Sequence, residues 1–438
     1  MTLVSDTVLD PSALFFVSYD GVVNNNSFQQ HAILTHAGYQ YATWYTGSRN
    51  AVVARRRLGG GWEKVTLPHR LSVDDSHNVI SLGISPQDGT LHVAMDTHDN
   101  RIHYVRSNAG VATRPSTTPW TSSAFGGVWR TLGGVDLGGM TYPCFLVTPE
   151  GRLQFGYRTG RSGNGVNELA EYDGGVWRVL GAWSSATGDY TGPNGVVSTT
   201  RNMYLHGLDY DGRGRLHAAF TWREGNAGVS CAPGGLTNHD TGYVYSDDRG
   251  RTWRNSSGAV VGTTGGTPVS VSSPGVVVDP LDPDHGLMNQ ESMVADSTGT
   301  PHVVISYVPD RFTRCVSDYA RQRAEHGRTF HLVRDPDGTW TKREVPVPPD
   351  SSQRTKLVFD RADNAYLVMP RGKVVAASRA SGWTDWATAF EPTSLRAFGE
   401  VNVDASRVAV DGVVSVQYQQ TSSGTTPSPI RVADLRLG

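Results

Sequence analysis

Short apolar segments separated by turn residues recur along the whole chain and predict strands. Each repeat has a turn rich in Gly, Asp or Asn, followed by a segment that alternates between apolar and polar positions, as a strand with one buried face does. The repeated turns and strands read AGYQYATWY (37–45), DGTLHVAM (88–95), EGRLQFGY (150–157), RGRLHAAF (213–220), TGTPHVVI (298–305), DNAYLVM (363–369) and DGVVSVQY (411–418).

Six of these seven units also end in a strand that carries a tryptophan: Trp62, Trp129, Trp177, Trp253, Trp340 and Trp383. Four strands in each of seven units predict an all-β fold, a seven-bladed β-propeller of antiparallel blades. The last unit lacks the Trp strand. We expect the segment Ala13–Val17 to replace it beside Ile430–Leu437, which would close the ring and leave one domain over residues 1–438. One short helix is expected, at Ser317–Glu325.

The segment Ser246–Trp253, SDDRGRTW, matches the Asp-box pattern S-x-D-x-G-x-T-W of sialidase-type propeller blades. Asp248 and Gly250 suit a tight turn, and Trp253 suits packing between sheets. We therefore interpret the box as structural. It indicates a propeller but not a sialidase, because the Arg-Ile-Pro motif expected near the N-terminus of a sialidase is missing.

Charge and cysteine content narrow the range of partners and compartments. The net charge of −2 gives no reason to expect nucleic acid or an anionic membrane as partner. No apolar run is long enough to span a bilayer. No signal peptide is recognisable, so the protein is either cytosolic or has lost a secretory leader. Cys144, Cys231 and Cys315 fit no zinc-binding spacing and allow at most one disulfide.

The segment Asp74–Ser107 is predicted to form a hairpin that brings two histidines together. Strands His77–Ser85 and Thr90–Met95 flank a Pro-Gln-Asp-Gly turn. His77 and His98 lie almost equally far from that turn, so they should face each other at its open end. No other unit of the repeat has a histidine at either of these two positions, so His77 and His98 are candidates for function. Three other histidines recur at one position of the repeat and are interpreted as structural: His92, His217 and His302.

The next two units place more polar side chains at the same end. Tyr142 and Arg158 are equally far from the turn of their unit, and Arg201 should lie roughly opposite Arg223 in the following one. Because the open ends of propeller blades point to one face, these side chains should surround one funnel, without a carboxylate pair. Further candidates for substrate binding in these units and the rim loops are Tyr204, His206, His239, Asn25 and Gln30.

Imidazole, phenol and guanidinium groups suit β-elimination at a uronic acid better than sugar hydrolysis, which normally uses two carboxylic groups. Arg on the uronate carboxylate stabilises the charge that develops when the C5 proton leaves. His or an ionised Tyr can take that proton, and another group can protonate the leaving O4. We expect His98 to be the main proton-transfer residue, assisted by His77 and Tyr142. Arg158, with Arg201 or Arg223, should hold the carboxylate.

Four segments of the chain are similar to a known family: HAILTHAGYQYATWYTG, DSHNVISLGISPQDGTLHVAMDTHDN, TYPCFLVTPEGRLQFGYRTGRSGNG and NHDTGYVYSDDRGRTWRNS. They resemble the BNR-4 group of seven-bladed propellers, which includes lyases of uronate-containing polysaccharides, ulvan lyases among them. The N-terminal DGVVNNNSFQQHAILTHAGYQYATWYT is more similar to L-rhamnose-α-1,4-D-glucuronate lyases, which act on gum arabic side chains. The ulvan branch commonly has two adjacent histidines where this chain has Asp96-Thr97-His98, which argues against ulvan.

The resemblance implies that His77, His98, Tyr142 and Arg158 line the catalytic cleft. It also implies a structural metal ion, with calcium near the propeller axis as the candidate, although the sequence does not identify its ligands. No organic cofactor is expected. The expected partner is an acidic polysaccharide or a proteoglycan glycan side chain, bound by a secreted monomer, with a cytoplasmic location as the alternative.

We therefore expect a carbon–oxygen lyase that releases terminal L-rhamnose from Rha-α-1,4-GlcA ends of arabinogalactan or gum arabic. Three alternatives remain: a uronate lyase of the ulvan type, a glycosidase resembling α-L-rhamnosidases, and a glycan-binding propeller without activity. The sequence decides neither which side chain is base and which is acid, nor between endo and exo action.

Overall fold

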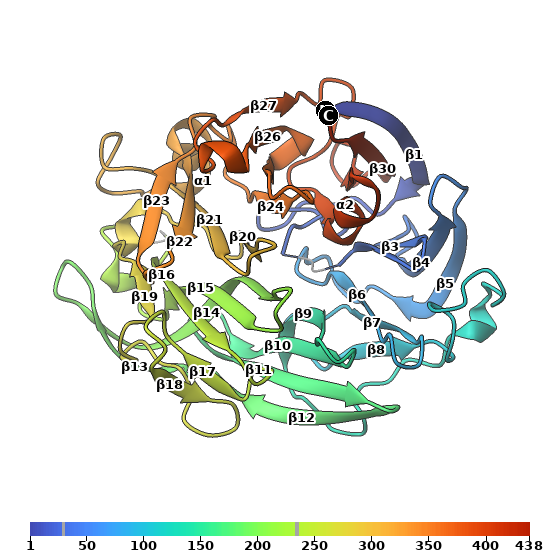
Figure 1. Ribbon diagram of the computed structural model, residues 1–438, viewed down its shortest axis with the longest axis horizontal. Coiled ribbons are helices and arrows are strands. Elements are labelled where there is room, and N and C mark those ends of the chain that lie inside the picture. The colour runs from blue at the N-terminus through green and yellow to red at the C-terminus, as the bar shows by residue number, and fades with distance from the viewer. Residues whose placement is uncertain (29–30, 233–235) are drawn as a thin grey trace.

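The computed structural model describes residues 1–28, 31–232 and 236–438. Its strands form sheets arranged around a central axis (Figure 1), so the expected all-β propeller architecture is confirmed. Within the described residues the strands form seven sheets. Two α-helices are present in this part of the chain, α1 (Tyr319–His326) and α2 (Ala405–Asp411).

Five sheets have four strands. The sheet that joins the two ends of the chain has the order β1 (Thr2–Ala13), β30 (Ser428–Arg436), β29 (Val413–Gln419), β28 (Asn402–Asp404). The others run in sequence order. They contain β2 (Ile33–His36), β3 (Tyr39–Tyr45), β4 (Asn50–Arg57) and β5 (Glu63–Arg70); β9 (Met140–Val147), β10 (Leu153–Arg161), β11 (Asn164–Asp173) and β12 (Val176–Ala182); β20 (Ser292–Ala295), β21 (Pro301–Tyr307), β22 (Arg328–Arg334) and β23 (Trp340–Glu344); β24 (Lys356–Phe359), β25 (Ala365–Val368), β26 (Val374–Ala377) and β27 (Ala387–Phe390).

Two sheets depart from the expected four strands. One contains only β6 (Ile80–Ile84), β7 (Leu91–Met95) and β8 (His103–Arg106). The expected fourth strand at Trp129 is wrong, because that residue makes only an isolated bridge to Tyr104. The other sheet is larger and contains β13 (Thr187–Thr191), β14 (Val197–Tyr210), β15 (Leu216–Glu224), β16 (Asn238–Ser246), β17 (Thr252–Arg254), β18 (Val260–Thr263) and β19 (Val277–Asp279).

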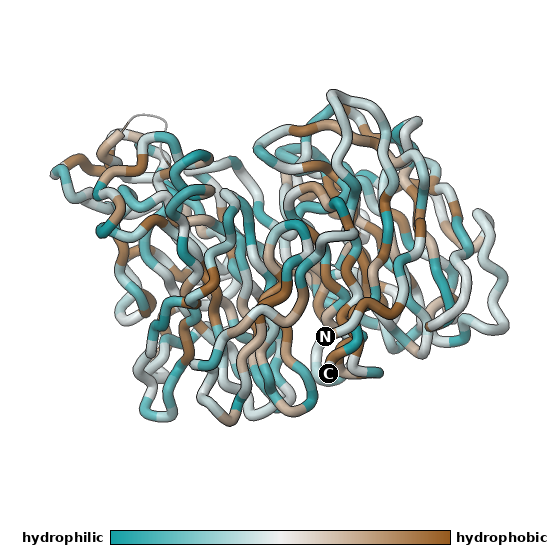
Figure 2. The backbone as a smooth tube through the Cα atoms, turned by 90° about the horizontal axis from the view of Figure 1, so that it is seen from above, coloured by the Kyte–Doolittle hydropathy of each residue, from teal (hydrophilic) through white to brown (hydrophobic). Residues whose placement is uncertain are grey.

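The N- and C-terminal strands share one sheet, as expected, but the segment proposed for this contact is wrong. β1 ends at Ala13 and pairs antiparallel with β30. The apolar residues that follow it, Leu14, Phe15 and Phe16, are buried in the core instead of continuing the strand. The termini consequently lie side by side (Figure 2).

The recurring histidines are buried in the sheets, in agreement with a structural role. His92, His217 and His302 each have a relative exposure of 1% or less. Nδ1 of each lies within hydrogen-bonding distance of a side chain on the next strand of its sheet, at 2.6 Å from Tyr104 Oη, 2.6 Å from Tyr243 Oη and 2.9 Å from His331 Nε2. One polar link between neighbouring strands therefore recurs in three sheets.

The Asp box is a turn in this structure. Asp248 accepts hydrogen bonds from Ser246 Oγ at 2.7 Å and from the Thr252 amide at 2.7 Å, and Trp253 stacks on Trp183 with ring centroids 4.3 Å apart. These contacts fit the structural interpretation.

Helix α1 confirms the short helix expected at Ser317–Glu325, and Asp318 caps its N-terminus. The sequence did not predict α2, which is only seven residues long. The cysteines form one disulfide, Cys231–Cys315, which leaves Cys144 as a thiol. In the described residues, no helix combines the length and apolar character needed to cross a membrane.

Candidate active site

A pocket of about 340 Å³ lies where the ends of several strands and their loops meet. Side chains from β9, β10, β14 and β15 line it, together with the loops around β6 and β7 and the segments before β2 and β24. It brings together six residues that the sequence singled out: His77, His98, Tyr142, Arg158, Tyr204 and Arg223.

The two histidines stack face to face and share one carboxylate. Their ring centroids are 4.4 Å apart, with an angle of 19° between the planes. His77 Nδ1 lies 3.0 Å from Asp75 Oδ1, and His98 Nδ1 lies 2.5 Å from Asp75 Oδ2. Because an ionised carboxylate only accepts hydrogen bonds, each Nδ1 carries a proton and each neutral ring keeps an unprotonated Nε2. Both rings can therefore act as bases through Nε2.

Asp75 is one of the site residues that sequence reasoning missed, since the funnel was expected to have no carboxylate pair. Its Oδ1 also accepts a hydrogen bond from the His77 amide at 2.8 Å, so it fixes the turn that leads into β6. An Asp side chain often accepts a hydrogen bond from the amide two residues later in the chain, and an Asp at this distance before His77 was the available signal. One side chain thus positions its own backbone turn and both imidazoles.

The charges at this cluster follow from burial and hydrogen bonding. Burial of Asp75 opposes its ionisation, but hydrogen bonds from His77 and His98 hold the pKa of Asp75 well below its usual range. Burial, together with the nearby His98 and Arg354, outweighs the attraction of Asp75 and lowers the pKa of His77. His77 is therefore neutral at pH 7 and suited to accept a proton.

Tyr142 enters the pocket from an interruption in β9. Arg158 on β10 pairs with Thr141, and the register shifts next to it, so Tyr142 lies in a bulge. Its φ is 60°, a conformation that costs about 1–3 kcal/mol for a residue other than Gly and that clusters at functional sites. Burial raises the pKa of Tyr142 well above its usual value, so its phenol is a proton donor at neutral pH.

Arg158 lies beside Tyr142, with its guanidinium carbon 5.0 Å from the centroid of the phenol ring. Its Nη2 donates to Asp99 Oδ1 at 2.7 Å and to Thr141 Oγ1 at 3.0 Å. The side chain is only 2% exposed, and Nε has no hydrogen-bond partner within the described residues. These contacts fix the Arg158 guanidinium at the pocket wall and leave its Nε–H free to donate a hydrogen bond.

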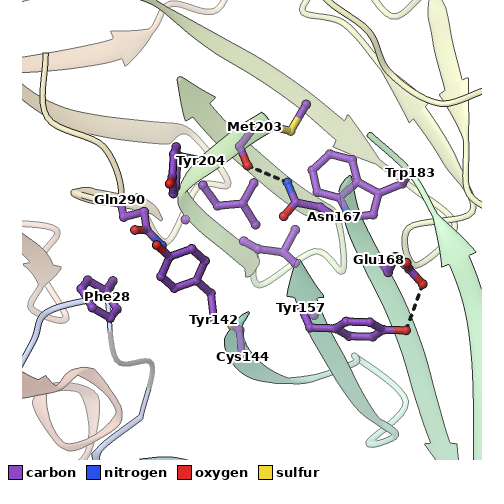
Figure 3. A pocket seen from close by; sticks show the side chains of 14 residues that line it. Phe28, Tyr142, Cys144, Tyr157, Asn167, Glu168, Trp183, Met203, Tyr204 and Gln290 are labelled. Atoms are coloured by element: carbon purple, nitrogen blue, oxygen red, sulfur yellow. Dashed lines mark hydrogen bonds between the residues drawn. The ribbon is translucent and has the colours of Figure 1, made fainter. Parts of the chain in front are cut away.

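Tyr204 continues the aromatic wall beyond Tyr142. The two ring centroids are 5.8 Å apart, and the Arg223 guanidinium carbon lies 6.0 Å from the Tyr204 centroid. Burial alone would raise the pKa of Tyr204, but the positive charges of Arg223 and Arg158 outweigh it and lower that pKa. Figure 3 shows Tyr142, Tyr204 and Gln290 close together beside a small, mostly apolar cavity behind this wall.

Arg354 supplies a further guanidinium that the sequence did not indicate. Its Nη1 donates to Glu400 Oε1 at 2.8 Å and its Nη2 donates to Asn289 Oδ1 at 2.8 Å, while its guanidinium lies 5.1 Å from the Phe28 ring centroid. Arg354 and Glu400 come from other units of the ring than the histidines. Counting residues within a single hairpin therefore could not predict that Arg354 and Glu400 lie near the histidines.

Arg201 does not reach the pocket, and the register gives the reason. It pairs with Glu224, whereas Arg223 pairs with Asn202. A register one residue away from the expected one places Arg201 on the opposite side of the sheet from Arg223. Arg201 is fully buried, with Nε 2.7 Å and Nη2 3.1 Å from the Glu224 carboxylate.

The remaining expected contacts also lie outside this pocket. His239 is buried between two carboxylates: its Nε2 lies 3.0 Å from Glu224 Oε1, and its Nδ1 lies 3.0 Å from Asp240 Oδ2. His206 accepts a hydrogen bond from the Glu291 amide at 3.2 Å and lines a separate cavity, and burial lowers its pKa to about 3. The Asn25 side chain donates to backbone carbonyls beside the pocket. Gln30 lies outside the described residues.

The described residues offer two groups of side chains that could hold a metal ion. They are Asp75 with His77 and His98, and Asp96 with His69 and His103. Both contain two imidazoles and one carboxylate, which differs from the all-oxygen ligand sets that calcium prefers. In the second group His103 Nε2 also lies 2.8 Å from Arg130 Nη1. Neither group fits the expected calcium ion.

The fold and site define a β-propeller with a pocket built for proton transfer next to fixed guanidinium groups. The chain belongs to the BNR repeat-containing family, whose BNR_4 model matches residues 39–347, more than half of the chain. This match confirms the family that the sequence resemblance indicated.

Among curated proteins, the chain is similar to the long isoform of ulvan lyase from Alteromonas sp. (strain LOR) and from Pseudoalteromonas sp. (strain PLSV). Each is 24% identical over 460 residues and matches 94% of this chain. The alignments cover 43% of those proteins, so the chain spans less than half the length of these relatives.

Two solved structures share the fold. The polysaccharide lyase Uly1 has a TM-score of 0.75 at 18% identity, covering 100% of both chains. A PL25 ulvan lyase bound to -[GlcA(1-4)Rha3S]- has a TM-score of 0.66 at 12% identity, covering 97% of this chain and 94% of that chain.

Proposed function

We propose that this protein is a polysaccharide lyase that cleaves the bond to O4 of a glucuronate by β-elimination. The observation that carries the proposal is the pair of stacked imidazoles on one shared carboxylate, in the same pocket as Arg158, Arg223 and Arg354. The relatives named ulvan lyases and the shared fold support this reaction class.

The elimination needs a base, an acid and a cation for the carboxylate. The guanidinium groups bind the uronate carboxylate and stabilise the negative charge that develops on it. Nε2 of one imidazole takes the C5 proton, the C4–O4 bond breaks, and a C4–C5 double bond forms. The departing O4 receives a proton from the Tyr142 phenol, or from the second imidazole when that ring carries a proton on Nε2 as well as on Nδ1, so that atoms and charge balance.

The placement of both imidazoles on one wall matches the stereochemistry of glucuronate. Its C5 hydrogen and its O4 lie on the same side of the C4–C5 bond, so base and acid must approach from one side. Two rings with centroids 4.4 Å apart meet that requirement. We assign the base to His77, which is neutral at pH 7, and keep His98 and Tyr142 as the candidate acids.

We further propose that the glucuronate carries an α-1,4-linked terminal L-rhamnose, as in gum arabic or arabinogalactan side chains, with ulvan as the alternative polymer. Hydrolysis by a carboxylic pair is less favoured, because hydrogen bonds and ion pairs occupy the carboxylates of Asp75, Asp99 and Glu400. The disulfide supports a secreted protein, since such bonds persist in oxidising compartments.

The proposed reaction is tested by incubating the protein with gum arabic, ulvan and a rhamnosyl-α-1,4-glucuronate disaccharide. We expect ultraviolet absorbance of an unsaturated uronate to rise together with free rhamnose from the disaccharide and gum arabic. Rhamnose release without that absorbance would show hydrolysis. Neither signal from any of the three substrates would contradict the proposed activity.

A further inference from the structure

A two-residue turn with an exposed aromatic tip overhangs the histidine pair. Ser18 and Gly21 exchange two backbone hydrogen bonds of 3.0 Å each, which places Tyr19 and Asp20 at the tip of a hairpin. Both tip residues have positive φ values, 50° and 61°. This conformation matches a tight hairpin turn but is unfavourable for Tyr, so the backbone holds the ring in place at an energetic cost.

The turn is anchored from two sides of the pocket. The Ser76 amide donates to Ser18 Oγ and the Ser76 hydroxyl donates to the Ser18 carbonyl, both at 2.7 Å. The Gln353 side chain donates to the Asp20 carbonyl. Despite this fixed backbone, the Tyr19 residue is 69% exposed and lines the pocket. The turn therefore places the Tyr19 ring beside His77, where a ligand can contact it.

Ring contacts give the order of side chains across the pocket. Tyr19 meets His77 edge to face, with centroids 4.6 Å apart. His77 lies 6.0 Å from Tyr142, which lies 5.8 Å from Tyr204, and the Arg223 guanidinium follows at 6.0 Å from Tyr204. The proton-transfer groups thus lie between an aromatic end at Tyr19 and a basic end at Arg223.

The two ends also differ in charge. Arg158, Arg161 and Arg223 line the basic end, and Asp20 lines the pocket beside Tyr19. Arg354 lies nearer the middle, on the Phe28 ring that stacks on His77. Asp20 forms no ion pair within the part of the chain that the structure describes. An acidic sugar bound between them would direct its carboxylate toward the arginines.

We propose that the Tyr19–Asp20 turn is the subsite for the leaving sugar and selects an uncharged, unsulfated rhamnose. The inference rests on the proposed lyase function. Tyr19 stacks on the apolar face of the leaving sugar, and Asp20 accepts hydrogen bonds from its neutral hydroxyls. A sulfate on that sugar would be repelled by the Asp20 carboxylate, which is specificity through an unfavourable contact.

The test compares the rhamnosyl-α-1,4-glucuronate disaccharide with the same disaccharide sulfated at O3 of rhamnose. The wild type should have the higher kcat/KM for the unsulfated form. Asp20→Asn should shift the ratio of the two kcat/KM values toward the sulfated form by about fivefold, the effect of one charge contact that is fully screened by water. Asp337→Asn, which removes an exposed acid that does not line the pocket, should leave the ratio unchanged.

Tyr19 is tested with two variants of different size. Tyr19→Asn removes the ring but suits a positive φ, so it should keep the turn while raising KM for both substrates by about tenfold. Tyr19→Phe keeps the ring and should recover most of that loss. A wild-type KM in Tyr19→Asn, or an unchanged ratio in Asp20→Asn, would overturn the inference. Absence of unsaturated product from the wild type with both disaccharides would instead count against the proposed function.

Discussion

At the scale of single residues, Asp75 organises the site without being expected to touch the substrate. Its two carboxylate oxygens each meet one imidazole, and one of them also accepts the His77 amide. Asp75 is therefore a positioning residue, since it sets which nitrogen of each ring is protonated. A nearby carboxylate also stabilises an imidazolium, so Asp75 raises the pKa of His77 relative to what burial alone would give.

Asp75→Asn should reduce kcat by about 10²-fold, because an amide has one acceptor and cannot hold both rings in the required tautomer. It should also move the acidic limb of the kcat/KM profile to lower pH. The sign follows from the lost negative charge, which makes His77 harder to protonate. The measurement is the pH dependence of unsaturated product formation.

Asp74→Asn serves as the matched control, because that neighbouring carboxylate is 53% exposed and pairs only with Arg49 among the described residues. It should retain wild-type kcat and the wild-type pH profile. A kcat for Asp75→Asn within about twofold of the wild type would contradict the positioning role.

How far the sequence predicts the site depends on how local each contact is. Residues equally far from a hairpin turn lie opposite each other, which was enough to bring His77 and His98 together. Counting residues from the turn gave the wrong position for Arg201. The strands pair one residue away from the expected register, which places the Arg201 side chain on the other side of the sheet. Arg354 reaches the pocket from a distant unit, a contact that no local spacing encodes.

At the scale of elements, insertions between strands complete the pocket, and a disulfide holds two of them together. Cys231 lies in the connection between β15 and β16, and Cys315 precedes α1, at a sequence separation of 84. The same two insertions contribute Leu236 and Tyr319 to the pocket lining. The disulfide is therefore expected to stabilise the fold and to hold the pocket lining in place.

Replacing both cysteines, Cys231→Ser with Cys315→Ser, should lower stability by about 2–4 kcal/mol, because the unfolded chain loses a constraint. The melting temperature should fall, and KM should rise more than kcat falls, since the insertions position substrate and contain no proton-transfer group. Thermal melts and steady-state kinetics measure these effects. A reducing agent should lower the melting temperature of the wild type but not that of the double variant, and a shift in both would contradict the assignment.

At the scale of the whole molecule, buried charges join the first and last strands of the ring. Asp434 on β30 accepts from Arg56 Nη2 at 2.8 Å and lies 2.7 Å from Arg407 Nη1, and Ser5 Oγ on β1 donates to it at 2.7 Å. Burial opposes ionisation of Asp434, but Arg56 and the surrounding hydrogen bonds lower its pKa. Strands from both ends of the chain thus meet at one carboxylate.

Asp434→Ala should destabilise the protein by about 3–5 kcal/mol, since it leaves the buried Arg56 guanidinium without a carboxylate and leaves Arg407 with only Asp411. Because the folded pKa of Asp434 is depressed, its contribution to stability is present above its unfolded pKa and is lost as the pH falls toward the folded value. Melting temperatures of wild type and variant should therefore converge in acid. Asp136→Asn, at the exposed ion pair with Arg101, is the control and should cost less than about 1 kcal/mol.

The pairing of β1 with β30 has a consequence for biosynthesis. Residues 2–13 leave the ribosome long before their partners at residues 428–436 are translated. An unpaired edge of twelve residues, with Val4 and Val8 exposed even after pairing, must stay free of other chains during that interval. Folding yield in the cell should therefore depend on elongation speed and on chaperones that shield this first strand.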